Sequence, residues 1–146
     1  MIRRVTVELG ERSYPILIGN SIDDEVVAFV RQAGYSARGM IVTDTNVGAL
    51  CAAHIAEVLE RAGLRTEVVT IPAGESSKSL TQADRLFTRA IELGLDRRSP
   101  IIALGGGVVG DLAGFVAATY MRGVPFIQLP TSLLAQVDSS VGGKVA

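Results

Sequence analysis

Apolar and polar residues alternate along the first part of the chain. Val5, Val7 and Leu9 are separated by polar residues, and after Gly10-Glu11 a second, apolar run covers 14–18. Alternation with a period of two is typical of a strand that buries one face. The pattern therefore predicts a β-hairpin with a Gly-X turn at Gly10-Glu11.

Beyond the hairpin, short apolar runs alternate with segments whose apolar residues recur every three or four positions. The short runs predict buried strands, and the wider spacing predicts amphipathic helices. Ser21, Asn46 and Ser79 begin these helices, Ser79 as a capping box with Gln82. The expected order is helix 22–33, strand 39–44, helix 46–62, strand 65–71, helix 80–93, strand 100–104, helix 112–120 and strand 124–129.

Alternating strands and helices indicate crossover connections between parallel strands. Such connections are right-handed, so helices are expected on both faces of the sheet. The sequence therefore predicts an α/β fold: a Rossmann-like, doubly wound, mostly parallel sheet with the hairpin at its edge. Its glycine-rich run follows a late strand and not the first, which departs from the usual dinucleotide pattern.

Length and composition narrow the class of protein. The chain of 146 residues is long enough for one domain, and its net charge of −1 lacks the basic excess of a nucleic-acid binder. No apolar run approaches the roughly 20 residues of a membrane span. A single cysteine, Cys51, fits a reducing cytoplasm, and a single histidine, His54, leaves little for a hydrolytic triad or a His-rich metal site. Both lie on the apolar stripe of helix 46–62, so we interpret both as packed structural residues.

Three consecutive glycines end the apolar strand at 100–104. Gly105, Gly106 and Gly107 carry no Cβ, and glycine permits φ above zero. A helix that begins there directs unpaired N–H groups and its positive dipole end at the same place, which suits a phosphate or pyrophosphate. The alternative is a tight strand-to-helix turn without a ligand.

Polar residues follow the other strands as well. In an open parallel sheet the carboxyl ends of the strands share one rim, where ligands bind, so we expect these groups to converge. Each group also has a structural alternative, as a helix cap, a solvated ion pair or a charge that favours a helix dipole. The groups are Thr43, Asp44 and Asn46; Pro72 to Lys78 with Glu75; Asp111; and Thr131 with Ser132.

The last part of the chain carries further candidates. Asp138 follows an apolar run and is expected to be partly buried, and a buried carboxylate needs a partner or a function. Lys144 follows Gly142-Gly143 and resembles a mobile cation aimed at an anion. Arg122 is either an exposed loop charge or an anion anchor.

These residues resemble the 3-dehydroquinate synthases of the shikimate pathway. The Gly-Gly-Gly-x-x-x-Asp element is shared with iron-dependent polyol dehydrogenases and sugar-phosphate cyclases, whereas the stretch from Pro130 separates the synthases from both. The resemblance covers essentially the whole chain. The matching pieces are Pro72-Ala-Gly-Glu-Ser-Ser-Lys78, Gly105-Gly-Gly-Val-Val-Gly-Asp111, Arg122-Gly-Val-Pro and Pro130-Thr-Ser-Leu-Leu-Ala-Gln-Val-Asp-Ser-Ser-Val-Gly-Gly-Lys144.

The resemblance implies a bound NAD. Asn46 and Gly74 lie beside matching residues and complete the expected set. Ser132 stands where the family more often has Thr, and it keeps the hydroxyl. The expected cofactor contacts are Asp44, Asn46, Gly74, Glu75, Lys78, Gly105, Gly106, Gly107, Val108, Gly110, Asp111, Thr131, Ser132 and Lys144.

The same resemblance implies the catalytic residues. Asp138 matches a residue beside the nicotinamide and the substrate hydroxyl, and Lys144 matches one that also touches substrate. Arg122 matches a residue that reaches the substrate phosphate from the neighbouring subunit of a homodimer. The implied reaction converts 3-deoxy-D-arabino-heptulosonate 7-phosphate to 3-dehydroquinate and phosphate, with NAD used catalytically.

The family also uses a divalent metal, zinc or cobalt, whose ligands are a Glu and two His in a C-terminal helical domain. Residues 1–146 contain none of these ligands, so we interpret them as the single NAD-binding, N-terminal domain of a two-domain cytoplasmic enzyme, inactive alone. Alternatives are a metal-dependent polyol dehydrogenase, a related sugar-phosphate cyclase, or an isolated nucleotide-binding or dimerisation module. No nucleic-acid or membrane partner is expected.

Overall fold

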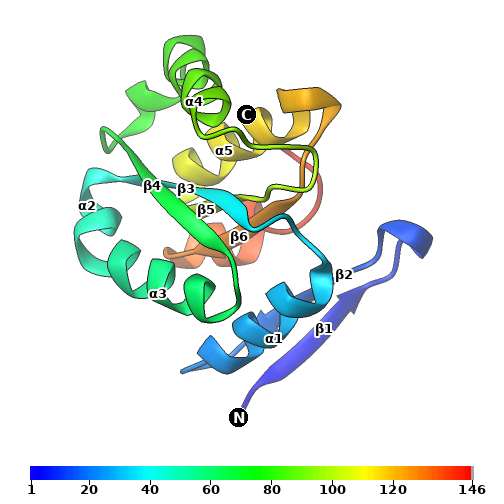
Figure 1. Ribbon diagram of the computed structural model, residues 1–146. Helices are drawn as coiled ribbons and strands as arrows, with labels where there is room; N and C mark the ends of the chain where they lie inside the picture. Colours follow the sequence, from blue (N-terminus) through cyan, green and yellow to red (C-terminus); the bar gives the residue numbers. More distant parts are fainter. Residues whose placement is uncertain (146) are drawn as a thin grey trace.

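The computed structural model describes residues 1–145, which form one two-stranded and one four-stranded sheet (Figure 1). The strands are β1 (Arg3–Val7), β2 (Tyr14–Ile18), β3 (Arg38–Asp44), β4 (Arg65–Ile71), β5 (Ile101–Gly105) and β6 (Phe126–Pro130). The main helices are α1 (Asp23–Ala33), α2 (Thr45–Val47), α3 (Ala53–Arg61), α4 (Leu80–Glu92) and α5 (Gly107–Thr119). Shorter turns are η1 (Gly10–Arg12), η2 (Gly48–Ala52), η3 (Glu75–Ser77), η4 (Tyr120–Arg122) and η5 (Ala135–Ser139).

The four-stranded sheet is wholly parallel and has the order β4-β3-β5-β6. The chain leaves β3 for β4 on one side and then crosses over to β5 on the other side. The carboxyl ends of β3 and β5 therefore flank a topological switch point, which is where ligands bind in sheets of this kind. The prediction of a doubly wound parallel sheet is confirmed.

Helices cover both faces of this sheet (Figure 1). On one face, α4 and α5 pack against Met40, Val42, Ile101 and Ala103. On the other, α1, η2 and α3 pack against the alternate residues Ile41, Ile102 and Leu104. Since successive strand residues point to opposite faces, the apolar runs predicted as strands supply both cores at once. No helix within residues 1–145 combines the length and the apolar character needed to span a bilayer.

The N-terminal hairpin forms, but two details of its prediction are wrong. It is a separate sheet, because β1 pairs only with β2 and neither strand extends the parallel sheet. Its connection is also longer than two residues: Val7 pairs with Tyr14, and η1 lies between them. The Ser13 hydroxyl stabilises this longer loop, since it accepts from the Leu9 N–H at 2.8 Å and donates to the Gly10 carbonyl at 2.7 Å.

The helix starts agree with the sequence in part. Ser79 caps α4 by accepting from the Gln82 N–H at 3.2 Å, as the capping box predicts. Ser21 does not cap α1, because its φ of 54° holds it in the left-handed region and the helix follows Ile22. The helix expected from Asn46 begins at Thr45, and α2, η2 and α3 are consecutive segments of one helical stretch.

Arginines bind the carboxyl ends of three helices at the amino-terminal rim of the sheet. Arg98 donates to the Gly34 carbonyl after α1, Arg38 to the Leu93 carbonyl after α4, and Arg31 to the Arg61 carbonyl that ends α3. The last turn of a helix leaves carbonyls without an intrahelical partner, and a cation also favours the negative end of the dipole. This rim is thus tied together by charge-assisted hydrogen bonds.

Candidate functional site

The glycine run joins β5 directly to α5 at the switch point. Gly106 is the N-cap of α5 and adopts φ −80°, ψ −165°, and none of the three glycines has a positive φ. The expected use of left-handed backbone is therefore absent at this corner. Gly105 has a packing reason instead, because a Cβ there would lie 2.7 Å from Cγ2 of Val109.

No comparable packing constraint within the fold requires glycine at positions 106 and 107. A Cβ on Gly106 would meet only the Ser132 hydroxyl at 3.7 Å, and one on Gly107 would meet the Ser139 hydroxyl at 3.6 Å. Both are ordinary contact distances. These two glycines therefore leave the N-terminus of the 13-residue helix α5 open. Its backbone N–H groups are accessible to an anion.

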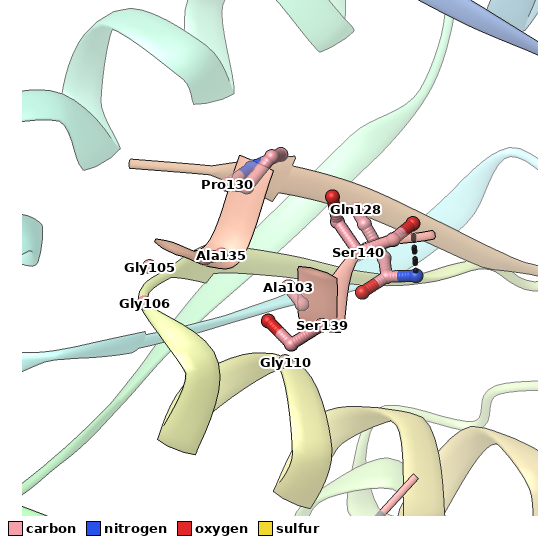
Figure 2. Close-up of a pocket in the computed structure, with 9 residues that line it drawn as sticks. All are labelled: Ala103, Gly105, Gly106, Gly110, Gln128, Pro130, Ala135, Ser139 and Ser140. Atoms are coloured by element: carbon pink, nitrogen blue, oxygen red, sulfur yellow. Dashed lines mark hydrogen bonds between the residues drawn. The ribbon is translucent and has the colours of Figure 1, made fainter. Parts of the chain in front are cut away.

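The next two residues of interest lie in the first turn of α5. Val108 is partly buried, and Gly110 faces the side chain of Gln128, whose Oε1 lies 3.5 Å from the position of a Cβ on Gly110. Behind the corner lies a cavity of about 10 Å³, lined by Gly105, Gly110 and Gln128 among others (Figure 2). It is large enough for about one water molecule, so a larger ligand must lie on the open side of the glycines.

Asp44 ends β3 and caps the helix that follows. One of its oxygens, Oδ1, accepts from the N–H groups of Asn46 and Val47 at 2.8 and 2.9 Å. The capping alternative considered for Asp44 is thus realised by that oxygen, while Asn46 is exposed. The neighbouring Thr45 hydroxyl accepts from the Ala73 N–H at 3.2 Å and so joins the tips of β3 and β4.

Lys78 joins the tip of β4 to α5. The turn before it contains Gly74 at φ 110°, a conformation that favours glycine. The Lys78 Nζ lies 2.8 Å from Oδ2 of Asp111 and 3.3 Å from Oε1 of Glu75. The hydrogen bond to Asp111 raises the pKa of Lys78 above its usual value, with a smaller contribution from Glu75. Glu75 itself remains largely exposed.

The tip of β6 lies against the glycine corner. The Thr131 N–H donates to the Gly105 carbonyl at 3.0 Å. Ser132 caps the following turn by accepting from the Ala135 N–H at 3.2 Å, so its structural alternative is also realised. Together with Thr45 and Lys78, these contacts place all four strand ends on one rim, as the sequence predicts.

Asp138 and Lys144 lie beyond this tip, in and after η5. Their Oδ1 and Nζ atoms are 3.2 Å apart, and their side chains are 59% and 75% exposed. The expectation that Asp138 is partly buried is wrong, because the apolar residues before it, Leu133, Leu134 and Val137, are themselves exposed. Asp138 nevertheless has a partner, because Lys144 pairs with it.

Arg122 does not join this group. It precedes β6 and follows α5, so it lies at the amino-terminal rim, the length of α5 away from the glycine corner. A helix rises about 1.5 Å per residue, so the 13 residues of α5 separate the two places widely. Arg122 is exposed and has a φ of 67°, next to Met121 at 50°. Its side chain therefore lies apart from the rim that carries the glycine corner.

The lone histidine is not packed in the core. His54 has 59% of its side chain exposed, and its Nε2 lies 3.0 Å from Oδ2 of Asp23 on α1. The interpretation as a buried residue on an apolar stripe is wrong, although the contact still joins α1 to α3. Cys51 is partly buried and packs against the core beneath these helices. Within residues 1–145, no three His, Cys, Asp or Glu side chains gather to hold a metal ion.

The sequence analysis missed three residues at or behind the rim: Thr45, Ser139 and Gln128. Thr45 and Ser139 gave no distinct signal among many exposed hydroxyls. Gln128 did give one, because it is the only polar side chain in the apolar run of β6, and a polar residue there needs a partner.

Comparison with known proteins places the chain in a family. Residues 68–146 match the family model described as the N-terminal part of 3-dehydroquinate synthase. A protein of Desulforamulus reducens named 3-dehydroquinate synthase is 58% identical over 142 residues, which are 97% of this chain. This chain belongs to the 3-dehydroquinate synthase family. A relative from Symbiobacterium thermophilum with the same name is 54% identical over 94% of the chain.

The chain spans 40% of the length of the Desulforamulus 3-dehydroquinate synthase and 39% of the Symbiobacterium one. Solved structures of other synthases share its fold. A 2-deoxy-scyllo-inosose synthase, complexed with carbaglucose-6-phosphate, NAD+ and Co2+, has a TM-score of 0.86 and 27% identity over 94% of this chain and 38% of its own. A 2-epi-5-epi-valiolone synthase from Streptomyces hygroscopicus, with NAD+ and Zn2+ bound, has a TM-score of 0.67 and 31% identity over 74% of this chain and 30% of its own.

Proposed function

We propose that residues 1–146 are the NAD-binding domain of a 3-dehydroquinate synthase, and that NAD binds along the rim described above. The observation that carries this proposal is the pair Gly106 and Gly107. Neither packing nor a positive φ accounts for the missing side chains, and both lie at the amino end of α5. A diphosphate that approaches the backbone closely does account for them.

The residues around the corner fit the remaining parts of a dinucleotide. Asp44 uses Oδ1 for its cap, and the Oδ2 atom is left to accept from ribose hydroxyls. Glu75 is an exposed acceptor of the same kind. Lys78 and the hydroxyls of Thr131 and Ser132 supply donors on either side of the glycines. Asn46, Gly74, Val108, Gly110 and Asp111 complete the proposed contact set.

Asp138 and Lys144 are proposed to act at the reacting end of the cofactor. When bound, NAD supplies a hydride acceptor that returns the hydride later, so that no net NADH forms. The Asp138 carboxylate accepts a hydrogen bond from the substrate hydroxyl that loses its proton, and Lys144 holds an anionic group of the substrate beside it. Arg122, on the far rim, is proposed to bind the substrate phosphate at the site of a second subunit in a homodimer.

The names of the relatives support the reaction: conversion of 3-deoxy-D-arabino-heptulosonate 7-phosphate to 3-dehydroquinate and phosphate in the shikimate pathway. The metal-containing neighbours support a divalent ion, zinc or cobalt, in the whole enzyme. Residues 1–145 do not fit such a site, so its ligands are proposed to come from a C-terminal helical domain. We propose that the whole enzyme is cytoplasmic.

A titration of the 146-residue chain with NAD tests the binding site. The Gly106→Val variant should lose heat of binding, because its side chain occupies the place of the diphosphate. Ala118→Val is the control, since it places the same valine side chain at an exposed position near the other end of the same helix. Circular dichroism checks that both variants fold. Equal affinity in the two variants, or no binding by the unchanged chain, would contradict the proposal.

The reaction is tested in a chimera that joins this chain to the remaining part of the Desulforamulus relative. Phosphate release from the heptulosonate phosphate, with no net gain of absorbance from NADH, is expected. A polyol dehydrogenase would instead release NADH stoichiometrically. Release of phosphate from glucose 6-phosphate in its place would favour a cyclase like the structural neighbour that binds carbaglucose-6-phosphate.

A further inference from the structure

We propose that Gln128 is a positioning residue that sets the place of Asp138 by holding the carboxyl end of η5. The inference rests on the proposed function, since it assigns to Gln128 a role toward a residue of that site. It begins from the location of the side chain, which lies in β6 opposite Ala103 and points from the sheet toward α5 and η5 (Figure 2).

The Gln128 amide has one clear partner. Its Nε2 donates to the Ser140 carbonyl at 3.2 Å, and its Oε1 lies beside α5, 3.5 Å from the position that a Cβ on Gly110 would take. An amide in an apolar strand carries a desolvation cost that a hydrocarbon of equal size would avoid. The hydrogen bond is therefore the property that distinguishes glutamine from methionine or leucine at this position.

The Ser140 carbonyl is the first one after η5. This turn is π-helical: the Ser140 N–H donates to the Ala135 carbonyl, five residues back, at 2.9 Å. Terminal carbonyls of a helix lack intrahelical donors, and Gln128 supplies one from a strand of the rigid sheet. Because π-helical turns are rare and are frequently found at functional sites, an outside contact that fixes one is informative.

Asp138 lies between these two fixed points. Ala135 is buried and anchors the start of η5, and Ser140 is held by Gln128 at the end. The Val141 N–H donates to the Asp138 carbonyl at 3.1 Å, which continues the turn toward Lys144. The side chains of Asp138 and Lys144 are exposed and contact each other. No packing against the core holds them, so the position of the η5 backbone sets the region that the Asp138 carboxylate can reach.

Loss of the amide should therefore move or loosen Asp138 without opening the nucleotide cradle. Gln128→Met keeps the length of the side chain and removes the donor. In the chimera we expect kcat to fall by about 10- to 100-fold, the effect of a displacement of about 1 Å at reacting groups. The Kd for NAD, which depends on Gly106 and Lys78, should stay close to that of the unchanged protein, and so should the melting temperature.

Two further variants make the test decisive. If Gln128 acts through Asp138, Gln128→Met combined with Asp138→Asn should be no slower than Asp138→Asn alone, because residues of one unit are not additive. Full multiplication of the two losses, or an unchanged kcat in Gln128→Met, would overturn the inference while the function stands. An unchanged kcat in Asp138→Asn would instead overturn the proposed role of Asp138, and this inference with it.

Hydrogen exchange of the 146-residue chain gives a readout that needs no activity. The Ser140 and Val141 amides should exchange faster in Gln128→Met, while the amides of α5 keep their protection. Equal exchange at Ser140 and Val141 in the two proteins would show that the contact does not hold the turn, and the inference would fail whatever the kinetics.

Discussion

Lys78 Nζ and Asp111 Oδ2 lie 2.8 Å apart and join the loop after β4 to the fifth residue of α5. The two residues are 33 positions apart in the sequence. The pair crosses the rim beside the switch point, so one contact ties two strand tips and places a negative charge near the amino end of α5, where the helix dipole favours it. The side chains are 32% and 23% exposed, which keeps the pair partly accessible to solvent.

A double-mutant cycle measures this pair. Lys78→Gln and Asp111→Asn should each lower the free energy of unfolding, and the coupling should be about 0.2–1 kcal/mol, the range of partly exposed ion pairs. Urea unfolding at neutral pH gives the four values. The coupling should shrink as salt is added, because the pair is accessible to solvent. A coupling of zero at low salt would contradict the bridge.

Adjacent glycines should differ sharply in their tolerance of a methyl group. Gly105→Ala brings a Cβ to 2.7 Å from Val109 Cγ2 in the core, and we expect a loss of about 1–3 kcal/mol in the free energy of unfolding, as for other overpacked cores. Gly106→Ala has room, so its stability should change little while its affinity for NAD falls. Thermal unfolding and calorimetric titration separate the two effects. A destabilised Gly106→Ala would show that this glycine serves packing.

The fold was largely predictable because its signals are local. The start of β5 at Ile101 follows directly from the apolar run before the three glycines, and the parallel arrangement follows from the alternation of elements. The position of the hairpin was not predictable, since strand pairing between distant segments depends on tertiary packing. The turn of the hairpin was misjudged for a local reason, because the part that Ser13 plays in the longer loop gives no signal in an alternation pattern.

The sequence predicted where the site lies better than it predicted which contacts its residues make. Parallel strands must bring their carboxyl ends to one rim, so Asp44, Lys78 and Thr131 were bound to converge. Sequence alone left open which atoms the fold itself would use, and Asp44 Oδ1 and the Ser132 hydroxyl turn out to cap helical turns. The exposure of Asp138 depends on how η5 packs, which an apolar run does not reveal.

The arginines at the amino-terminal rim should contribute stability and leave the cofactor site unchanged. Arg38→Met removes the donor to the Leu93 carbonyl, and we expect a loss of about 0.5–1.5 kcal/mol, the net value of one hydrogen bond. Arg97→Met is the matched control, because the described residues offer its side chain no hydrogen-bond partner. Urea unfolding should separate the two variants, and both should bind NAD like the unchanged chain. Equal stabilities would refute the capping role.

Asp96 should make the stability of the chain depend on pH. Its carboxylate accepts from the Ser36 hydroxyl at 2.6 Å and from the Arg98 N–H at 2.8 Å, and so joins the loops that precede β3 and β5. These hydrogen bonds, the Ser36 one first, hold the pKa of Asp96 below its usual value. A depressed pKa means that the folded chain binds the proton more weakly than the unfolded chain does.

The contribution of Asp96 to the free energy of unfolding is therefore full above the pKa of an unfolded aspartate, about 3.9. It is lost as the pH falls through the lower pKa that Asp96 has in the folded chain. Asp96→Asn should be less stable than the unchanged chain at pH 7, and the difference should shrink below about pH 4. Asp84→Asn, at an exposed position on α4, is the control and should show no such change. Urea unfolding from pH 7 down to below pH 4 measures this difference. If the unchanged chain and Asp96→Asn differ by the same amount at every pH, the Asp96 carboxylate does not cause the pH dependence.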